Sequence, residues 1–248
     1  MKHFLSRFLI FLLAFLVVTT SLSLPQLSAN RLASFEAVDT KSTVPFTVVL
    51  DAGHGGEDGG AVSAAGFAEK EANLAIALCL QELLEANGIT VRLTRSEDIL
   101  LYDRDVDYHG RKKALDLAAR RKIAESTENC VFVSIHMNAY PIEKYNGLQV
   151  WYSPNNPSSR LLAENVQSMT SDLLQPDNNR KVKAATSSIY LLHHLNCPAI
   201  LVECGFLSNP EEAAALATED YQKKLAFLLF LSISESLDKL SDEIAYSP

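Results

Sequence analysis

Hydrophobic positions along the chain follow two different periods from Phe46 onward. Short apolar runs rich in β-branched residues predict strands, and stretches with apolar residues three and four positions apart predict helices. The predicted strands are 47–51, 90–94, 130–135, 148–152 and 199–203, and the predicted helices are 69–86, 111–126, 158–174 and 221–240. Because strands and helices alternate, we expect a single α/β domain with a mainly parallel, twisted sheet and helices on both faces.

The N-terminal stretch has a different pattern. Basic residues within the first seven positions precede an uncharged, largely apolar segment at 8–29, which is the pattern of an export signal. The strictly apolar part has the length of a signal, and with its tail the segment is long enough to serve as an uncleaved membrane anchor. The expected organisation is a signal peptide or anchor at 1–29, a linker at 30–44, the folded domain at 45–240 and a tail at 241–248.

Composition and charge narrow the classes of function. The chain is 48% hydrophobic and 21% charged, as in ordinary globular proteins. A formal net charge of -8 without a basic stripe argues against nucleic-acid binding. The four cysteines form no C-x-x-C pair, so a cysteine zinc site is not expected. We interpret them as buried free thiols, with a disulfide between Cys197 and Cys204 as the alternative.

Candidate chemistry gathers at the carboxyl ends of the predicted strands, where ligands bind in open α/β sheets. In VVLDAGHGGEDGG, the first strand breaks into five glycines around His54. Glu69 begins the first helix, His136 follows the third strand, and Glu203 ends the fifth. Two histidines and a carboxylate predict a three-ligand Zn²⁺ site with a fourth position for water. Glu203 is then the candidate general base.

Each of these residues also has a structural interpretation. The two histidines suit hydrogen bonding in a turn or at a strand end, and Glu69 suits the first turn of a helix. Glu203 is harder to explain in this way, because a carboxylate at the end of an apolar strand needs a partner. Asp51 and Asn138 flank the histidines and are candidates for orienting the imidazole rings. Hydrogen bonding in turns and at strand ends explains these two equally well.

Four blocks of sequence resemble a known family. LDAGHGGEDGGA followed by EKEANL, then VSIHMNA, then PAILVECGFLSN, is similar to the zinc-dependent N-acetylmuramoyl-L-alanine amidases of the amidase-3 type, in that family's order. The resemblance implies one Zn²⁺ per chain bound by His54, Glu69 and His136, with Glu203 as the catalytic residue. It also implies hydrolysis of the amide between the lactyl group of N-acetylmuramic acid and L-alanine in peptidoglycan.

The form of the chain resembles one subgroup of that family. Only Tyr140–Asn146 separates the SIH block from the next predicted strand, so we expect no helical lid of the kind some relatives carry there. A single catalytic domain behind a signal resembles the germination-specific amidases, which strip stem peptides from spore cortex so that muramic δ-lactam forms. This implies an extracytoplasmic location at the membrane, cell wall or spore envelope, and admits an accessory activator protein.

Two other interpretations stay open. A zinc carboxypeptidase or peptidase that cuts within stem peptides would use the same metal chemistry. An arginine clamp for a terminal carboxylate would favour it, and the candidates are Arg95 and Arg180. A non-catalytic wall-binding protein would keep the fold around a relic site, although retention of all the ligand types argues against it. We expect the polar segment 175–188 to form a loop on the substrate side.

Overall fold

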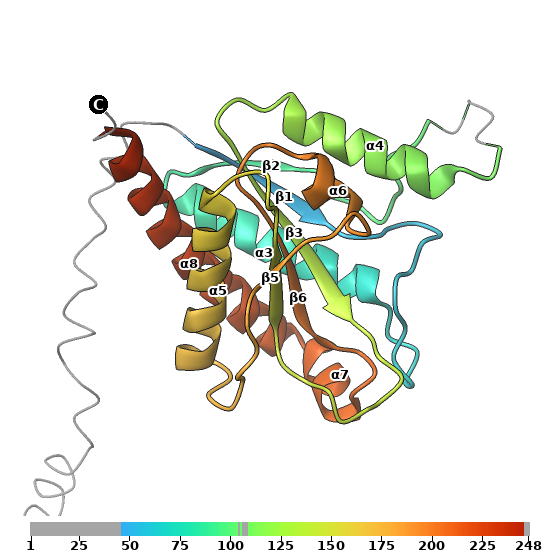
Figure 1. Ribbon diagram of the computed structural model, residues 1–248. Coiled ribbons are helices and arrows are strands. Elements are labelled where there is room, and N and C mark those ends of the chain that lie inside the picture. The colour runs from blue at the N-terminus through green and yellow to red at the C-terminus, as the bar shows by residue number, and fades with distance from the viewer. Residues whose placement is uncertain (1–45, 104, 106–108, 246–248) are drawn as a thin grey trace, which may run out of the picture. The chain divides into compact units, whose positions relative to one another are not determined.

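A six-stranded sheet forms the centre of the domain, in the order β2-β1-β3-β6-β4-β5. The computed structural model describes residues 46–103, 105 and 109–245 (Figure 1). The strands are β1 (Thr47–Ala52), β2 (Thr90–Leu93), β3 (Cys130–Asn138), β4 (Gln149–Tyr152), β5 (Lys183–Ala184) and β6 (Ala199–Phe206). Only the pair of β4 with β6 is antiparallel among these strands. The predicted fold class, a mainly parallel α/β domain, is confirmed.

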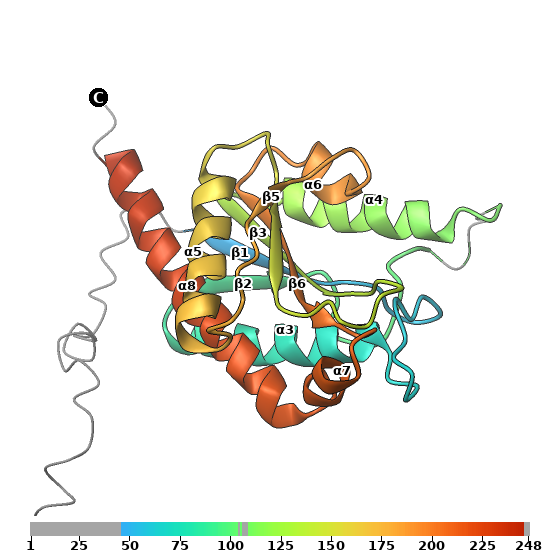
Figure 2. The ribbon, with the colours of Figure 1, turned by 60° about the horizontal axis from the view of Figure 1, so that its bottom comes forward.

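Helices cover both faces of the sheet (Figures 1 and 2). The first face packs against α3 (Glu69–Ala86), α5 (Ser158–Leu173) and α8 (Glu219–Ala245), and α8 contacts both of the others. The second face packs against α4 (Lys112–Glu125) and α6 (Tyr190–His194), while α7 (Pro210–Leu216) follows β6.

The alternation of side chains along the strands explains why one face is fully covered and the other only in part. On the first face, aliphatic residues of β1, β3 and β6 form the main core: Val48, Leu50, Val131, Val133, Ile200 and Val202. On the second face, Val49, Phe132 and Leu201 form a smaller core with residues of α4 and α6. Beyond this core, toward the carboxyl ends of the strands, the positions become polar. This half of the second face therefore carries polar side chains that are not covered by a helix, and it is the candidate location of a functional site.

Several boundaries differ from the predicted ones. β3 and β6 each continue three residues further than expected, because their hydrogen-bonded pairing extends through the polar positions. The closing helix α8 begins at Glu219 and runs to Ala245, into the predicted tail. β5, α6 and α7 were not predicted, since each is short and lies in a polar or mixed segment. As expected, residues 139–148 join β3 to β4 without a helix.

The predictions for the N-terminal stretch lie outside the described residues, so the signal or anchor and the linker stay predictions. Within the described part, no helix combines the length and apolar character needed to cross a membrane. The four cysteines are free thiols, and the alternative disulfide is not formed. Cys204 is fully buried and its Sγ donates to the Val202 carbonyl, while Cys197 lies beside Cys130.

Candidate active site

A row of polar side chains crosses the uncovered half of the second face. His136 on β3, Glu203 on β6 and Gln149 on β4 occupy facing positions on neighbouring strands. All residues of β6 are buried except Glu203, which is partly exposed. In β3 the open positions are His136 and Asn138. The sheet itself thus places the histidine and the carboxylate side by side, although 67 positions separate them in sequence.

His54 and Glu69 join this row from the loop after β1 and from the first turn of α3. Oε1 of Glu69 lies 2.9 Å from Nδ1 of His136 and 3.2 Å from Nε2 of His54. Donor atoms of the three residues all lie within 4.8 Å of one another. The predicted cluster of two histidines and a carboxylate is therefore brought together by the fold.

The Glu69 carboxylate is held in place by its surroundings. Oε1 accepts hydrogen bonds from the Met137 backbone N–H at 2.9 Å and from Nδ2 of Asn73 at 3.4 Å. Oε2 accepts from the Ala61 N–H at 2.8 Å. Burial raises the pKa of Glu69, but hydrogen bonds and charge from the two histidines outweigh it and hold that pKa well below its usual value. Glu69 is consequently a carboxylate, the form that binds a cation.

The donor set suits Zn²⁺. In a tetrahedral site with donors at 2.0–2.1 Å from zinc, the donor atoms lie roughly 3.3 Å apart. The separations from Glu69 to the two histidines are 2.9 and 3.2 Å, close to this spacing. Two imidazoles and one carboxylate also form the ligand set of hydrolytic zinc enzymes, with one position left for water. The residues present therefore fit the metal that the sequence predicts.

Glycines in the first loop make room for these ligands. A Cβ at Gly53 would lie 2.3 Å from Nε2 of His136, and one at Gly60 would lie 2.5 Å from Oε2 of Glu69. Gly60 also has a φ of +67°, which disfavours other residues. The glycines around His54 thus allow the backbone to approach the ligands closely.

Two buried arginines stabilise the loop after β1 that carries His54, which we call the ligand loop. Arg95 donates to the carbonyls of Ala52 at 2.8 Å and Gly53 at 2.9 Å. Arg120 donates to the Ala52 carbonyl at 2.8 Å and to the His54 carbonyl at 2.7 Å. His54 has a φ of 61°, in the left-handed region, so these bonds stabilise an uncommon backbone conformation. Arg95 is occupied by backbone carbonyls and does not form a clamp for a substrate carboxylate.

The two candidates for orienting the imidazoles have different surroundings. Asp51 accepts hydrogen bonds from Arg120, Ser134 and Thr94, at 2.7, 2.6 and 2.8 Å. These three donors occupy the Asp51 carboxylate. Asp51 supports the ligand loop through Arg120, because Arg120 also donates to carbonyls of that loop. The carbonyl of Asn138 accepts from the Leu207 N–H at 2.8 Å, which ties β3 to the end of β6.

Asp58 and Asn73 were not singled out from the sequence. Oδ1 of Asp58 lies 3.0 Å from Nδ1 of His54, so this carboxylate faces the ring nitrogen turned away from Glu69. Asn73 lies one helical turn after Glu69 and also donates to the Gly53 carbonyl at 3.1 Å. The i,i+4 spacing of Glu69 and Asn73 is the signal that identifies the latter as a neighbour.

Glu203 is the unusual titratable group of the site. Its Oε2 is buried and has no hydrogen-bond partner among the described residues. Burial raises the pKa of Glu203 to about 7, with the nearby Glu69 also raising it and the two histidines opposing. A carboxyl group that titrates near neutral pH can both accept and donate a proton under working conditions. This is the property required of a general base that later acts as an acid.

Comparison with known proteins agrees with this geometry. A family model described as N-acetylmuramoyl-L-alanine amidase matches residues 48–235. The chain belongs to this family. The germination-specific N-acetylmuramoyl-L-alanine amidase of Bacillus subtilis is 36% identical over 186 residues, covering 75% of this chain and 77% of that protein. The amidase AmiA of Escherichia coli is 32% identical over 230 residues, covering 75% and 74% of the two chains.

A solved amidase structure has the same fold as this chain. The CwlD amidase from Clostridioides difficile, in complex with the GerS lipoprotein, superposes with a TM-score of 0.74 at 39% sequence identity. The match covers 78% of this chain and 98% of that one. The chain is therefore an N-acetylmuramoyl-L-alanine amidase, and the resemblance noted from its sequence blocks is confirmed.

Proposed function

We propose that the amidase is a Zn²⁺-dependent peptidoglycan hydrolase in which His54, Glu69 and His136 bind one metal ion and Glu203 is the catalytic base. The observation that carries this proposal is the convergence of the three donor groups beside a buried carboxyl oxygen of Glu203 that has no hydrogen-bond partner among the described residues. The bond cleaved is the amide between the muramic lactyl group and L-alanine. Zinc in this site would polarise the amide carbonyl and lower the pKa of bound water toward about 7.

The residues of the chain perform the proton transfers. Oε2 of Glu203 accepts a proton from the attacking water and then donates it to the alanine nitrogen as the C–N bond breaks. The products are a free lactyl carboxylate on the sugar and a stem peptide with a free amino terminus. Arg95 and Arg120 bind no substrate in this scheme, because they hold the backbone of the ligand loop.

The relatives support a biological setting for this amidase. A germination-specific amidase and a CwlD amidase are among the similar proteins, and this supports a role in spore cortex maturation. The latter was solved with a lipoprotein, which supports an accessory protein partner for this amidase also. The proposed location is extracytoplasmic, at the membrane, cell wall or spore envelope, where the substrate lies.

One digestion experiment tests the proposed function. The purified enzyme is incubated with intact and with lysozyme-digested peptidoglycan, with and without a chelator, and the products are analysed by mass spectrometry. Stem peptides that begin at alanine and disappear with chelator are expected. Cleavage inside the stem peptide would favour the peptidase instead. Absence of any cleavage by zinc-loaded enzyme, with and without its accessory protein, would favour a non-catalytic wall-binding protein.

A further inference from the structure

The polar row of the active site extends past Glu203 toward the sheet edge formed by β4 and β5. Gln149 faces Glu203 across the β6–β4 pair. Its Nε2 donates to the carbonyl of Lys181, and its Oε1 accepts from Nη1 of Arg180 at 3.2 Å. Arg180 is therefore the next charged side chain along the row after the catalytic glutamate.

The Arg180 side chain is held in position by its neighbours, and its Nη2 group is available to donate hydrogen bonds. Its Nε donates to the Asn146 carbonyl at 2.7 Å, and its guanidinium lies 4.5 Å from the centroid of the Phe206 ring. Nη2 makes no hydrogen bond to any described residue, and the side chain is only partly buried. The nearby Glu212 is occupied, since both of its oxygens accept backbone N–H groups from Gly147 and Phe206. A planar guanidinium held in this way is suited to bind a carboxylate.

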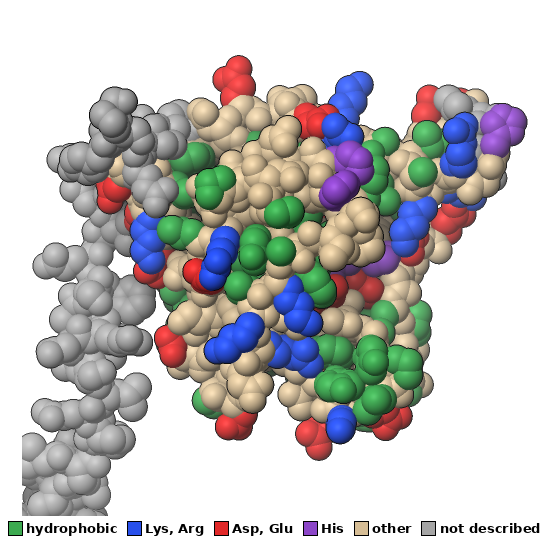
Figure 3. Space-filling view, in the orientation of Figure 1, with side chains coloured by type: hydrophobic (Ala, Val, Ile, Leu, Met, Phe, Trp, Pro, Cys, Tyr) green, Lys and Arg blue, Asp and Glu red, His purple; other side chains and the backbone are tan. Residues whose placement is uncertain are grey.

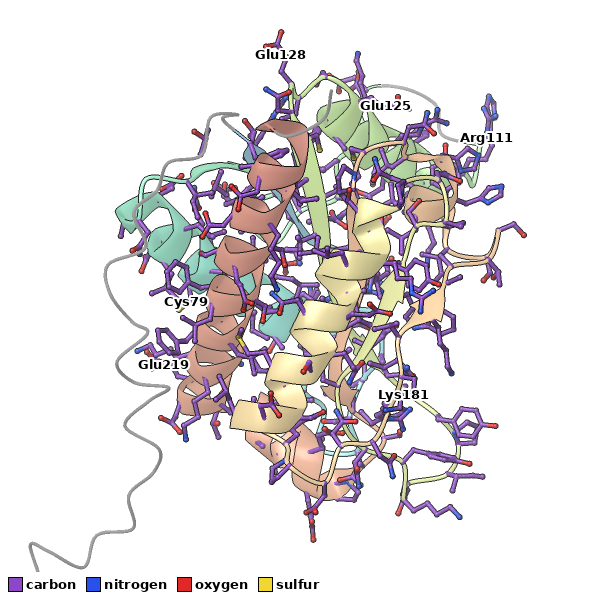
Figure 4. All side chains as sticks on the ribbon, turned by 60° about the vertical axis from the view of Figure 1, so that its left-hand side comes forward. Cys79, Arg111, Glu125, Glu128, Lys181 and Glu219 are labelled. Atoms are coloured by element: carbon purple, nitrogen blue, oxygen red, sulfur yellow. The ribbon has the colours of Figure 1, made fainter. Side chains whose placement is uncertain are left out.

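Positive charge gathers around Arg180 although the protein as a whole is acidic. Lys181 and Lys183 are exposed neighbours on the same segment. Figure 3 shows Lys and Arg side chains grouped over the segment that contains β5, next to an apolar patch, and Figure 4 shows Lys181 on the side of α5 away from α8. The net charge of the chain is -8, so this local excess favours an anionic ligand beside the site.

The order of residues along the row indicates the direction in which the stem peptide runs from the reacting bond. Glu203 protonates the alanine nitrogen in the proposed mechanism, and it lies on the β4 side of His136. A stem peptide that leaves the reacting bond on the side of Glu203 then runs toward β4 and Arg180. Two extended residues span at most about 7 Å, and neighbouring strands are about 4.8 Å apart. A carboxylate on the second residue of the stem thus comes within reach of Arg180.

We propose that Arg180 binds the carboxylate of the second stem-peptide residue and makes the amidase prefer stems that carry the acid there over stems that carry the amide. This rests on the proposed function, because it assumes cleavage at the lactyl–alanine bond. The proposal gives the segment before β5 a role in substrate specificity. The ligand that this segment recognises is an anionic peptide.

Two matched substrates test this assignment. They are disaccharide tripeptides that differ only in an α-carboxylate or an α-carboxamide on the second residue. Wild type is expected to cleave the acid with a kcat/KM about 10- to 100-fold higher, the range of a hydrogen-bonded pair with a charged group. Arg180→Gln should bring the ratio of kcat/KM between the acid and the amide close to 1, whereas Arg180→Lys should retain part of the preference. Arg160→Gln, an exposed arginine on α5, is the matched control.

The outcomes are separable. An equal fall on both substrates would show that Arg180 only supports the fold, and no fall on either would remove it from the substrate site. Either result would overturn the assignment while leaving the proposed function intact. Failure of zinc-loaded wild type to cleave either substrate or intact peptidoglycan would contradict the proposed function itself, and this assignment with it.

Discussion

One oxygen of Glu203 is buried and has no hydrogen-bond partner in the part of the chain that the structure describes. Burying a polar atom in this way costs free energy, and a catalytic role explains why the residue is there. Replacement by glutamine keeps the shape and removes the proton acceptor. We expect Glu203→Gln to bind zinc at the wild-type ratio and to lose a factor on the order of 10² to 10⁴ in kcat. Metal analysis and the rate of stem-peptide release measure the two quantities. A variant with wild-type turnover would exclude Glu203 as the base.

The pH dependence of the reaction gives a second prediction for the same residue. Burial raises the pKa of Glu203 from 4.5 to about 7, and a base is active only when unprotonated. A bound cation adds positive charge and moves the pKa back down. The acid limb of kcat/KM is therefore expected between pH 4.5 and about 7, with activity lost as the pH falls through it. A pH–rate profile that stays flat down to pH 4 would contradict this.

The residues of the candidate site differ in how far the sequence could predict them. His54, Glu69, His136 and Glu203 were predictable as a cluster, since parallel strands bring their carboxyl ends to one edge. Arg180 was visible only as a possible clamp, because its position depends on β5 and on stacking against Phe206. For Asp51 the sequence left two roles open, orienting an imidazole or hydrogen bonding at a strand end, since a buried salt bridge to Arg120 cannot be predicted from two distant positions.

At the scale of elements, a buried charge network fixes α4 to the end of β1. Arg120 bonds to Asp51 at 2.7 Å and to Asp116 at 2.7 Å, and all three side chains are nearly fully buried. Removing one partner of a buried ion pair leaves uncompensated charge and costs about 3–5 kcal/mol. We expect Arg120→Met to lower the free energy of unfolding by this amount, measured by denaturant titration.

The neighbouring arginine supplies the control. Arg121 pairs with Glu125 on the outer side of α4, where both side chains are partly exposed. Arg121→Met should leave the denaturation midpoint nearly unchanged. Equal midpoints for the two variants would show that the buried network does not stabilise the connection between α4 and β1.

The elements that could be predicted are those with a long, regular hydrophobic pattern. The helices and the main strands were recognised because their periods repeat over several residues. β5 consists of Lys183 and Ala184, which have no pattern of their own and form a strand only because β4 offers an edge. The extension of β3 through Asn138 was missed because polar residues there look like a loop, although the pairing with β6 continues.

For the whole molecule, the metal site links distant parts of the chain. Its ligands come from the loop after β1, from α3 and from β3, so a cation bound to all three stabilises only the folded state. At a free zinc concentration 100 times the Kd, this linkage adds about 2.7 kcal/mol to the free energy of unfolding. We expect zinc to raise the melting temperature of the chelator-treated enzyme, and His136→Ala to abolish that rise. Glu203→Gln should keep it, because Glu203 is outside the ligand set. An identical zinc response in wild type and His136→Ala would place the metal elsewhere on the molecule.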